Sequence, residues 1–312
     1  MISIVIPVYN EEATLRELHQ RVVEVMLKQN DSYEIIFIND GSTDRTYEVA
    51  KDLRPLKMIT LQRNYGDTPA LDVGIQEAKG DIIIFMDADL QDDPGELIKM
   101  LHKLSEGCDV IVSWRRKRYD RPSRIIFSRF ANMIVSYVLG VNIHDFGCGL
   151  KIYKSKFIKD FRLWGEAQVF LPAIAKERGA RICEVEISHY PRKYGSSKIK
   201  ISKMIKGGFD LISVAFFIKY FSKPLRFFGG WGLFSIVLSF TAFISSLLLR
   251  IYNTPLTTTP LPTVGTLFAL TGVILFMLGL LAEIVLRNYY AVVGRSPYFI
   301  REIIDNGRSV KE

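Results

Sequence analysis

Two long uncharged apolar runs near the C-terminus constrain this chain more than any other feature. Residues 227–249 (FFGGWGLFSIVLSFTAFISSLLL) hold no charged side chain over 23 positions, and residues 264–282 form a second such run. About 20 apolar residues in a helix cross the ~30 Å hydrocarbon core of a bilayer. Buried helices of a soluble core rarely extend this far without a charged face. The sequence therefore predicts two transmembrane helices.

The charges around these runs predict an orientation. The intervening loop, residues 252–263, is uncharged, whereas Lys and Arg residues precede the first run and follow the second. By the positive-inside bias, the N-terminal part and both termini lie in the cytoplasm of a two-helix membrane protein. The first residues lack the basic segment of a signal peptide. The formal charge of +8 favours anionic lipid headgroups or phosphorylated substrates as partners. No nucleic-acid recognition module is legible, so no nucleic-acid partner is expected.

The three cysteines and two of the histidines show no pattern that predicts a metal site or a disulfide. Cys108, Cys148 and Cys183 show neither paired nor metal-like spacing, so we expect reduced, structural thiols in a cytosolic domain. His144 and His189 stand isolated in the sequence and are expected to be structural.

Residues 1 to about 190 alternate short apolar runs with helix-like stretches. Five runs rich in Ile and Val suit strands buried on both faces: residues 2–8, 33–38, 56–61, 81–86 and 109–113. The stretch after the first run has apolar residues at helical spacing, at positions 15, 18, 22, 25 and 26. This alternation predicts an α/β domain with a mostly parallel sheet and right-handed crossovers.

Acidic and amide side chains follow three of these strands. They lie in YNEE (9–12), NDGSTD (39–44) and DADLQDD (87–93), after the first, second and fourth runs. Ligands bind beyond the carboxyl ends of strands in such sheets. The three segments are therefore predicted to converge on one rim and form the site.

The fourth-strand segment predicts a metal site. Asp87, Asp89 and Gln91 are spaced two residues apart, so in an extended continuation of the strand they point to one side. Their hard oxygen atoms suit Mg²⁺ or Mn²⁺, with places left open for the oxygens of a diphosphate. Asp92 or Asp93 instead suits the N-cap of the next helix, which Pro94 would begin. Asp40, directly after the second strand, is placed to accept hydrogen bonds from a ribose or a base. A simpler interpretation of this segment is that Ser42 or Asp44 caps the next helix.

Two further stretches point to the membrane surface. Residues 199–226 are basic and aromatic, which predicts an amphipathic helix in the membrane interface. The stretch 123–140 suits either the interface or packing on the sheet. The predicted organisation is a cytoplasmic α/β domain over 1–198, an interface helix over 199–226, two transmembrane helices over 227–290 and a cytoplasmic tail over 291–312.

Four motifs resemble one enzyme family. They are IPVYNEE (6–12), INDGSTDRT (38–46), RNYG (63–66) followed by ALDVGIQEAKGDIIIFMDADLQDDP (70–94), and PRKYGSSK (191–198). Together they resemble inverting family-two glycosyltransferases with the Rossmann-like GT-A fold. The chain looks closest to the polyprenyl-phosphate branch, which includes dolichol-phosphate mannose synthases and undecaprenyl-phosphate glucosyl and aminoarabinosyl transferases. This resemblance covers residues 2 to 200.

The resemblance implies roles for particular residues. It implies that the nucleoside is held by Pro7, Tyr9, Glu11 and Asp40, with Arg63 approaching the nucleotide. Asp87 and Asp89 match the DxD pair, Asp89 and Gln91 match metal ligands, and Asp145 matches an acidic position sometimes assigned as a base. Arg192, Ser197 and Lys198 match a juxtamembrane motif thought to meet phosphates. Relatives often carry arginine where this chain has Leu150–Lys151, so a phosphate role there transfers poorly, although Lys151 supplies a point charge.

The resemblance implies an in-line transfer of a sugar from a nucleotide-diphosphate sugar, and the donors most frequent in the family make UDP-glucose the expected one. The acceptor phosphate of undecaprenyl phosphate would lie near Arg115, Arg116, Arg118 or Arg124, and it is largely ionised near neutral pH, so no general base is required. A hydroxyl acceptor, as in polysaccharide synthesis, would need Asp145 as base. A non-catalytic membrane adaptor or lipid-translocating subunit is the third hypothesis, and a homo-oligomer stays open.

Overall fold

The protein is described from a computed structural model. The chain divides into two compact units, residues 1–215 and 216–312, and each is described by itself. The predicted boundaries at 198 and 226 remain predictions. The structure describes residues 1–29, 31–116, 122–163, 165, 167–190, 211, 213–216, 220, 224–252, 255, 259–293, 303–305 and 308–310.

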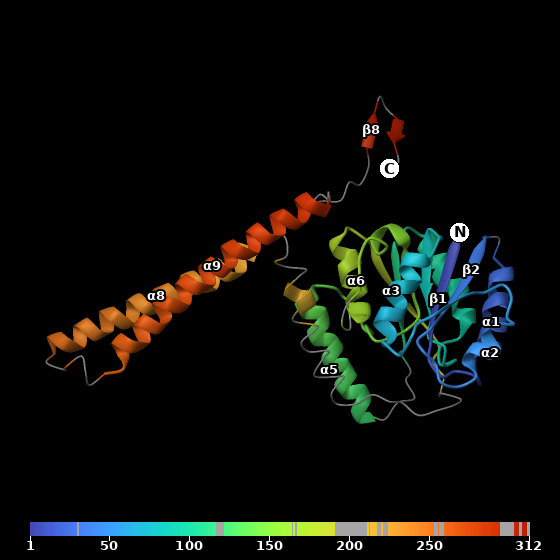
Figure 1. The fold of residues 1–312 in the computed structure, drawn as a ribbon, viewed down its shortest axis with the longest axis horizontal. Coiled ribbons are helices and arrows are strands. Elements are labelled where there is room, and N and C mark those ends of the chain that lie inside the picture. Colours follow the sequence, from blue (N-terminus) through green and yellow to red (C-terminus); the bar gives the residue numbers. More distant parts are fainter. Residues whose placement is uncertain are drawn as a thin grey trace. The chain divides into compact units, whose positions relative to one another are not determined.

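The N-terminal unit, whose ribbon is drawn in Figure 1, contains a seven-stranded sheet. Its strand order is β3-β2-β1-β4-β6-β5-β7. The strands are β1 Ile2–Val8, β2 Tyr33–Asn39, β3 Lys57–Thr60, β4 Ile82–Phe85, β5 Val110–Trp114, β6 Lys151–Lys154 and β7 Ile182–Glu186. Every pairing is parallel except those of β6, which runs antiparallel to both β4 and β5. The mostly parallel α/β sheet and its first five strands are therefore confirmed.

Helices cover both faces of this sheet. They are α1 Leu15–Leu27, α2 Thr46–Ala50, α3 Asp67–Glu77, η1 Pro94–Glu96, α4 Leu97–Ser105, α5 Pro122–Leu139, η2 Ser155–Phe157 and α6 Ala167–Glu177. The predicted apolar face of α1, from Leu15 to Met26, is buried in the main core with Ile4, Ile6 and Leu97. On the other face α3 contacts β1 and β2, and Gly74 lets its backbone approach Val5 closely.

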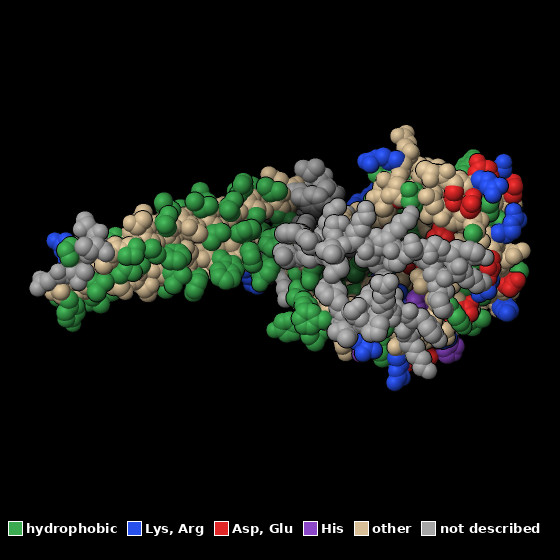
Figure 2. Space-filling view, turned by 90° about the horizontal axis from the view of Figure 1, so that it is seen from below, with side chains coloured by type: hydrophobic (Ala, Val, Ile, Leu, Met, Phe, Trp, Pro, Cys, Tyr) green, Lys and Arg blue, Asp and Glu red, His purple; other side chains and the backbone are tan. Residues whose placement is uncertain are grey.

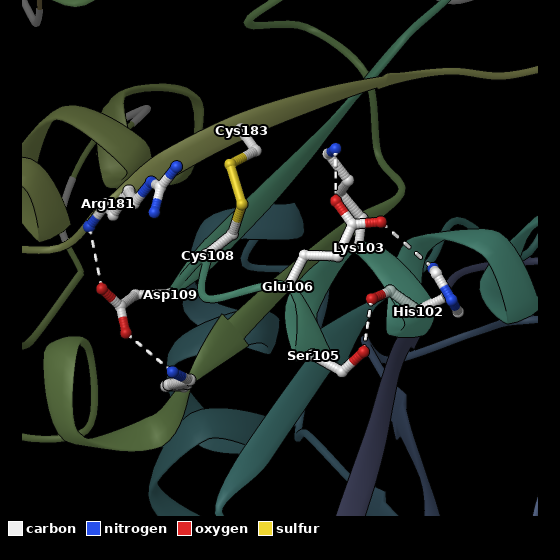
Figure 3. Close-up of a disulfide and its surroundings, with 9 residues drawn as sticks. His102, Lys103, Ser105, Glu106, Cys108, Asp109, Arg181 and Cys183 are labelled. Atoms are coloured by element: carbon white, nitrogen blue, oxygen red, sulfur yellow. Dashed lines mark hydrogen bonds and ion pairs between the residues drawn. A yellow bond between two sulfur atoms is a disulfide. The ribbon is translucent and has the colours of Figure 1, made fainter.

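The cysteine prediction is wrong for two of the three residues. Cys108 and Cys183 form a disulfide with a Cα–Cα distance of 6.1 Å, although 75 residues separate them (Figure 3). Cys108 precedes β5 and Cys183 lies in β7, and these strands are parallel neighbours. The spacing of the cysteines along the sequence does not predict this disulfide, because the pairing of β5 with β7 brings the two residues together. Cys148 is a free, buried thiol as expected.

The C-terminal unit contains α8 Pro224–Ile251 and α9 Leu261–Val293, followed by the short strands β8 Ile303–Asp305 and β9 Arg308–Val310. Residues Pro224–Ile251 and Leu261–Leu286 are long and apolar enough to be candidate membrane spans. Hydrophobic side chains cover the surface of this hairpin (Figure 2). Most of the predicted interface helix, 199–226, lies outside the described residues.

Small residues allow α8 and α9 to pack closely. A Cβ atom on Gly232 would lie 2.9 Å from the carbonyl oxygen of Gly272. Ser235 donates a hydrogen bond to the Phe268 carbonyl (2.8 Å), and Ser239 donates one to the Gly265 carbonyl (2.7 Å). In these contacts the residue numbers increase along α8 while those of their partners decrease along α9. The two helices therefore run antiparallel. Close backbone approach and hydroxyl-to-carbonyl bonds are typical of helix pairs in lipid.

Candidate active site

The loops after β1 and β2 are joined by hydrogen bonds. The Asn10 side chain accepts from the Thr43 backbone N–H (2.8 Å), and the Asn10 N–H donates to Ser42 (3.0 Å). Asn10 has a positive φ of 57°, a conformation that asparagine tolerates better than most residues. Glu11 is held in the same way, because its N–H donates to Thr46 (2.9 Å). Tyr9, which is 36% exposed, therefore sits on a fixed rim.

Asp40 joins this rim to the chain before α3. Its two carboxylate oxygens accept backbone N–H bonds from Tyr65 and Gly66, both at 2.8 Å. Partial burial raises the pKa of Asp40, and these two bonds lower it in part. Arg63 is exposed and stacks over the Tyr65 ring at 4.4 Å. Tyr9, Glu11 and Asp40, which are predicted to hold the nucleoside, thus lie on connected loops. Pro7, the fourth such residue, is half-buried near the end of β1.

The segment after β4 is not an extended continuation of the strand, so that part of the prediction is wrong. β4 ends at Phe85, and Leu90 has a positive φ of 58°, which is uncommon for a residue other than glycine. The Gln91 N–H donates to Asp89 Oδ1 at 3.1 Å. The chain therefore turns between Asp89 and Gln91, and a local turn, rather than strand alternation, sets their relative position.

Asp87 lies directly against Gly149. A Cβ atom at position 149 would overlap the Asp87 carboxylate, so only glycine leaves room for it. Asp87 is nevertheless exposed at the surface. Partial loss of water beside neighbouring protein atoms, added to the negative charges of Asp89 and Asp92, raises the pKa of Asp87 to about 7. The crowded charges predicted from the sequence are therefore present, and a cation would relieve them.

Asp92 and Asp93 have different roles. Asp93 is the N-cap of η1, because its side chain accepts from the Gly95 N–H at 2.9 Å. Asp92 is buried and contacts His189 Nδ1 at 3.4 Å and Cys148 Sγ at 3.6 Å. Burial raises the pKa of Cys148 to about 12, so the thiol stays protonated. His189 is isolated in the sequence but paired in the fold, 97 residues away from Asp92.

Asp145 is held by Arg115 in a two-pronged ion pair. Arg115 Nε lies 2.8 Å from Asp145 Oδ2, and Nη2 lies 3.1 Å from Oδ1. The two side chains are 13% and 4% exposed. The Gly147 N–H donates to the same carboxylate at 3.2 Å. Asp145 therefore neutralises a mostly buried cation.

Lys151 is an interior residue rather than a surface charge. It is 5% exposed, and its ammonium group donates to the Phe146 carbonyl at 2.8 Å. Burial lowers the pKa of Lys151 to about 8, against the opposite pull of Asp145 and Asp87. Lys151 thus fixes the loop that carries Asp145 and Gly149.

The structure shows less about the other residues that were predicted to contact phosphates. Arg116 is exposed, lies over the Trp114 ring at 6.0 Å and forms an ion pair with Glu186 at 3.4 Å. Arg118, the side chain of Arg124, and Arg192, Ser197 and Lys198 lie outside the described residues. Their phosphate contacts remain predictions.

The family is decided by comparison with known protein families. The model of the glycosyl transferase family 2 matches residues 3–162, which include the loops after β1, β2 and β4 and the loop that carries Asp145 and Gly149. This chain is a family 2 glycosyltransferase. The family predicted from the sequence is therefore confirmed.

Curated relatives of this glycosyltransferase match over nearly its full length. The dodecaprenyl-phosphate galacturonate synthase of Rhizobium johnstonii is 35% identical, over 98% of this chain and 93% of the relative. The undecaprenyl-phosphate 4-deoxy-4-formamido-L-arabinose transferase of Pseudomonas aeruginosa is 32% identical, over 97% and 90%. The Aeromonas hydrophila protein of the same name is 34% identical, over 97% and 94%.

Solved structures confirm the GT-A fold of this glycosyltransferase. Glucosyl-3-phosphoglycerate synthase from Mycobacterium tuberculosis, in complex with Mn²⁺ and uridine-diphosphate-glucose, matches with a TM-score of 0.55 and 16% identity. The match covers 69% of this chain and 78% of that chain. The same enzyme with Mn²⁺, uridine diphosphate and phosphoglyceric acid matches with a TM-score of 0.56 and 18% identity, over 70% and 78%.

Sequence reasoning did not single out Gly149 and Tyr190, and it did not foresee how Lys151 and His189 act in the site of this glycosyltransferase. Gly149 and Lys151 approach the rim because β6 inserts antiparallel beside β4, and His189 and Tyr190 contact the loop at 89–92. The GCGLKIY stretch after Asp145 held the only legible signal, since glycine before a strand marks a close backbone approach.

Proposed function

We propose that this glycosyltransferase moves a sugar from a nucleotide-diphosphate sugar to a polyprenyl phosphate. The observation that carries the proposal is the similarity over 97–98% of the chain to relatives named as polyprenyl-phosphate sugar transferases or synthases. Both candidate membrane spans fall inside that match. The finer proposal is UDP-glucose as donor and undecaprenyl phosphate as acceptor.

The geometry of Asp145 favours a phosphate acceptor over a hydroxyl acceptor. A hydroxyl needs a base that accepts its proton, and a carboxylate bound through both oxygens by Arg115 is a weak base. A phosphate monoester is already largely ionised near neutral pH, since its second pKa is about 6. One of its oxygens attacks the anomeric carbon, and the bond to the nucleoside diphosphate breaks with both electrons leaving on the diphosphate.

The rim fits a divalent cation held mainly by substrate. Among the described residues no group of three or more His, Cys, Asp or Glu side chains is arranged to hold a metal ion. Mg²⁺ commonly uses one or two carboxylates and takes its other ligands from phosphates and water. Asp89 and Gln91 would hold Mg²⁺ or Mn²⁺, with Asp87 beside them. Bound there, the ion supplies positive charge to the leaving diphosphate.

We further propose that the catalytic unit and both termini face the cytoplasm, with the α8–α9 loop on the other side. The uncharged loop and basic flanks support this orientation. Helix α5 supports membrane contact: its side chains at positions 130, 133, 134 and 137 lie on one helical face and are 56%, 60%, 38% and 87% exposed. Phe, Met, Ile and Tyr in such a row suit the bilayer interface.

A lipid-transfer assay tests the function. Detergent-solubilised protein is given Mg²⁺ or Mn²⁺, polyprenyl phosphate and a panel of radiolabelled nucleotide sugars that includes glucose, galacturonate and 4-deoxy-4-formamido-L-arabinose donors. Label moving into the lipid extract supports the proposal and names the donor. Label in lipid from another sugar but not from glucose corrects the finer proposal. Metal-dependent nucleotide-sugar binding without any lipid product would favour the non-catalytic adaptor.

A further inference from the structure

We propose that His189 is a positioning residue that, with Asp92, fixes the Gln91 side chain for metal binding. This inference rests on the proposed function, because it assumes a divalent cation at Asp89 and Gln91. The unit concerned is the pairing of residues 91–92 with residues 189–190, which we call the 91–190 clamp. It joins the loop after β4 to the chain that follows β7.

The backbone part of the clamp is a short antiparallel contact. Asp92 and His189 form an isolated β-bridge, and the Tyr190 N–H donates to the Gln91 carbonyl at 2.9 Å. One step away, the Ser188 N–H donates to Glu96 Oε1 at 2.9 Å. Three successive residues after β7 are therefore bound to the segment that follows β4.

The side-chain part of the clamp orients the Gln91 amide. Gln91 Nε2 donates to the Tyr190 carbonyl at 3.4 Å. An amide has a donor end and an acceptor end, and only the oxygen can bind a cation. With the nitrogen turned to Tyr190, the oxygen faces away from the clamp. A half-buried glutamine without this partner would exchange the two ends.

His189 and Asp92 lock the clamp from the protein interior. Both side chains are 4% exposed, and His189 Nδ1 lies 3.4 Å from Asp92 Oδ1. The other Asp92 oxygen lies 3.6 Å from Cys148 Sγ, and the Ser113 hydroxyl donates to that sulfur at 2.7 Å. Asp92 is the residue next to Gln91, so a shift of the buried pair moves the candidate metal ligand directly.

The turn at Leu90 explains why such a lock is needed. Leu90, between Asp89 and Gln91, has a φ of 58° and is buried. A non-glycine residue keeps this unfavourable conformation only when its surroundings hold it. The Gln91 N–H bond to Asp89 holds one side of the turn, and the clamp holds the other. Without His189 the loop is free to relax, and Asp89 and Gln91 separate.

Metal binding, measured apart from turnover, tests this inference. Full-length His189→Ala is compared with wild type by titrating Mn²⁺ in the presence of UDP and following free Mn²⁺ by electron paramagnetic resonance. We expect the Kd for Mn²⁺ to rise about tenfold, the lower end of the effect of removing residues that orient metal ligands. UDP affinity in EDTA should change by less than about twofold. His189 contacts the loop after β4, whereas the residues predicted to hold the nucleoside lie in the loops after β1 and β2.

Two further variants separate positioning from folding. His189→Asn keeps a donor near the Nδ1 position and is expected to restore Mn²⁺ affinity to within about threefold of wild type. His102→Ala removes a histidine–carboxylate contact of the exposed surface, to Glu106, and should leave Mn²⁺ affinity unchanged. If His189→Ala does not fold, the isosteric Asp92→Asn decides alone, with a smaller loss of Mn²⁺ affinity expected.

Unchanged Mn²⁺ affinity in folded His189→Ala, or in Asp92→Asn where that variant decides, overturns the inference. An equal loss of UDP affinity in EDTA also overturns it, because it would indicate general disruption of the rim. Failure of the proposed function looks different. Wild type would then bind Mn²⁺ and UDP with the pattern above but put no sugar on lipid. Wild type that binds UDP but never Mn²⁺ overturns both the metal assignment and the clamp's role.

Discussion

The Arg115 guanidinium binds the Asp145 carboxylate through two nearly parallel contacts, Nε to Oδ2 at 2.8 Å and Nη2 to Oδ1 at 3.1 Å. Both groups are largely shielded from solvent. The pair joins the end of β5 to the loop before β6, and both carboxylate oxygens of Asp145 accept hydrogen bonds from Arg115. A charge pair in this setting is costly to break on one side only, because the other charge stays buried.

Asp145→Asn is therefore expected to lower the free energy of unfolding by about 3 kcal/mol, because Arg115 loses its counter-charge. Urea unfolding of the variant and wild type measures this. Glu186→Gln is the matched control, since the Arg116–Glu186 pair is 65% and 49% exposed and should contribute less than about 1 kcal/mol. Folded Asp145→Asn should keep most of its transfer to polyprenyl phosphate. Loss of all transfer would instead support a hydroxyl acceptor with Asp145 as base.

Gly149→Ala should weaken binding of Mn²⁺ and nucleotide together by at least about tenfold, because the new methyl group displaces the Asp87 carboxylate. Calorimetric titration with UDP and Mn²⁺ measures the loss. Gly147→Ala is a close control from the same loop, since its Cβ would lie 3.7 Å from its nearest neighbours. Equal effects of the two substitutions would show that loop flexibility, rather than contact with Asp87, is responsible.

Mn²⁺ affinity should rise with pH between about 6 and 8, because the pKa of Asp87 is raised to about 7 and the cation competes with that proton. In Asp87→Asn the same titration should lose this rise. The sign for stability is opposite. The folded state binds the Asp87 proton more tightly than the unfolded state, so the contribution of Asp87 to stability is full below about pH 4 and is lost as pH rises through about 7. Thermal unfolding of the metal-free protein across this range checks the second part.

Removing the Cys108–Cys183 disulfide by Cys108→Ser should destabilise the N-terminal unit by up to about 4.5 kcal/mol, the chain-entropy limit for a linkage of this span. Thiol labelling after denaturation checks that the linkage is formed. One thiol per chain should react without reductant, that of Cys148, and three should react with it. Three reactive thiols under both conditions would show that the pair is reduced, as in the predicted cytosolic setting.

Replacing Phe130 and Tyr137 by serine should lower kcat/KM for polyprenyl phosphate in lipid vesicles by about thirtyfold, since each exposed ring loses apolar contact with the bilayer worth ~1 kcal/mol. KM for the nucleotide sugar should stay unchanged. Tyr47→Ser, on the exposed surface of α2, is the control. Equal activity of the double variant and the control would argue against membrane contact by α5.

The sequence by itself determined the parts of this protein that depend on local pattern. Consecutive apolar residues defined the strands and the two long helices, because burial on both faces or in lipid requires such runs. The order of parallel strands then brought the segments after β1, β2 and β4 to one rim, since these strands are neighbours. The family motifs lie in the same segments.

Only the tertiary structure decided how that rim is supported. The antiparallel insertion of β6 sets Gly149 against Asp87 and buries Lys151. The glycine before β6 indicates a close approach, but only the pairing of β6 with β4 decides which residue it approaches. His189 meets Asp92 across 97 residues, and Cys108 meets Cys183 across 75. Such contacts form between residues that chain spacing does not relate, because packing of the whole sheet and its loops creates them. The acidic segment was legible in the sequence, while the partners that orient Asp87 and Gln91 required the fold.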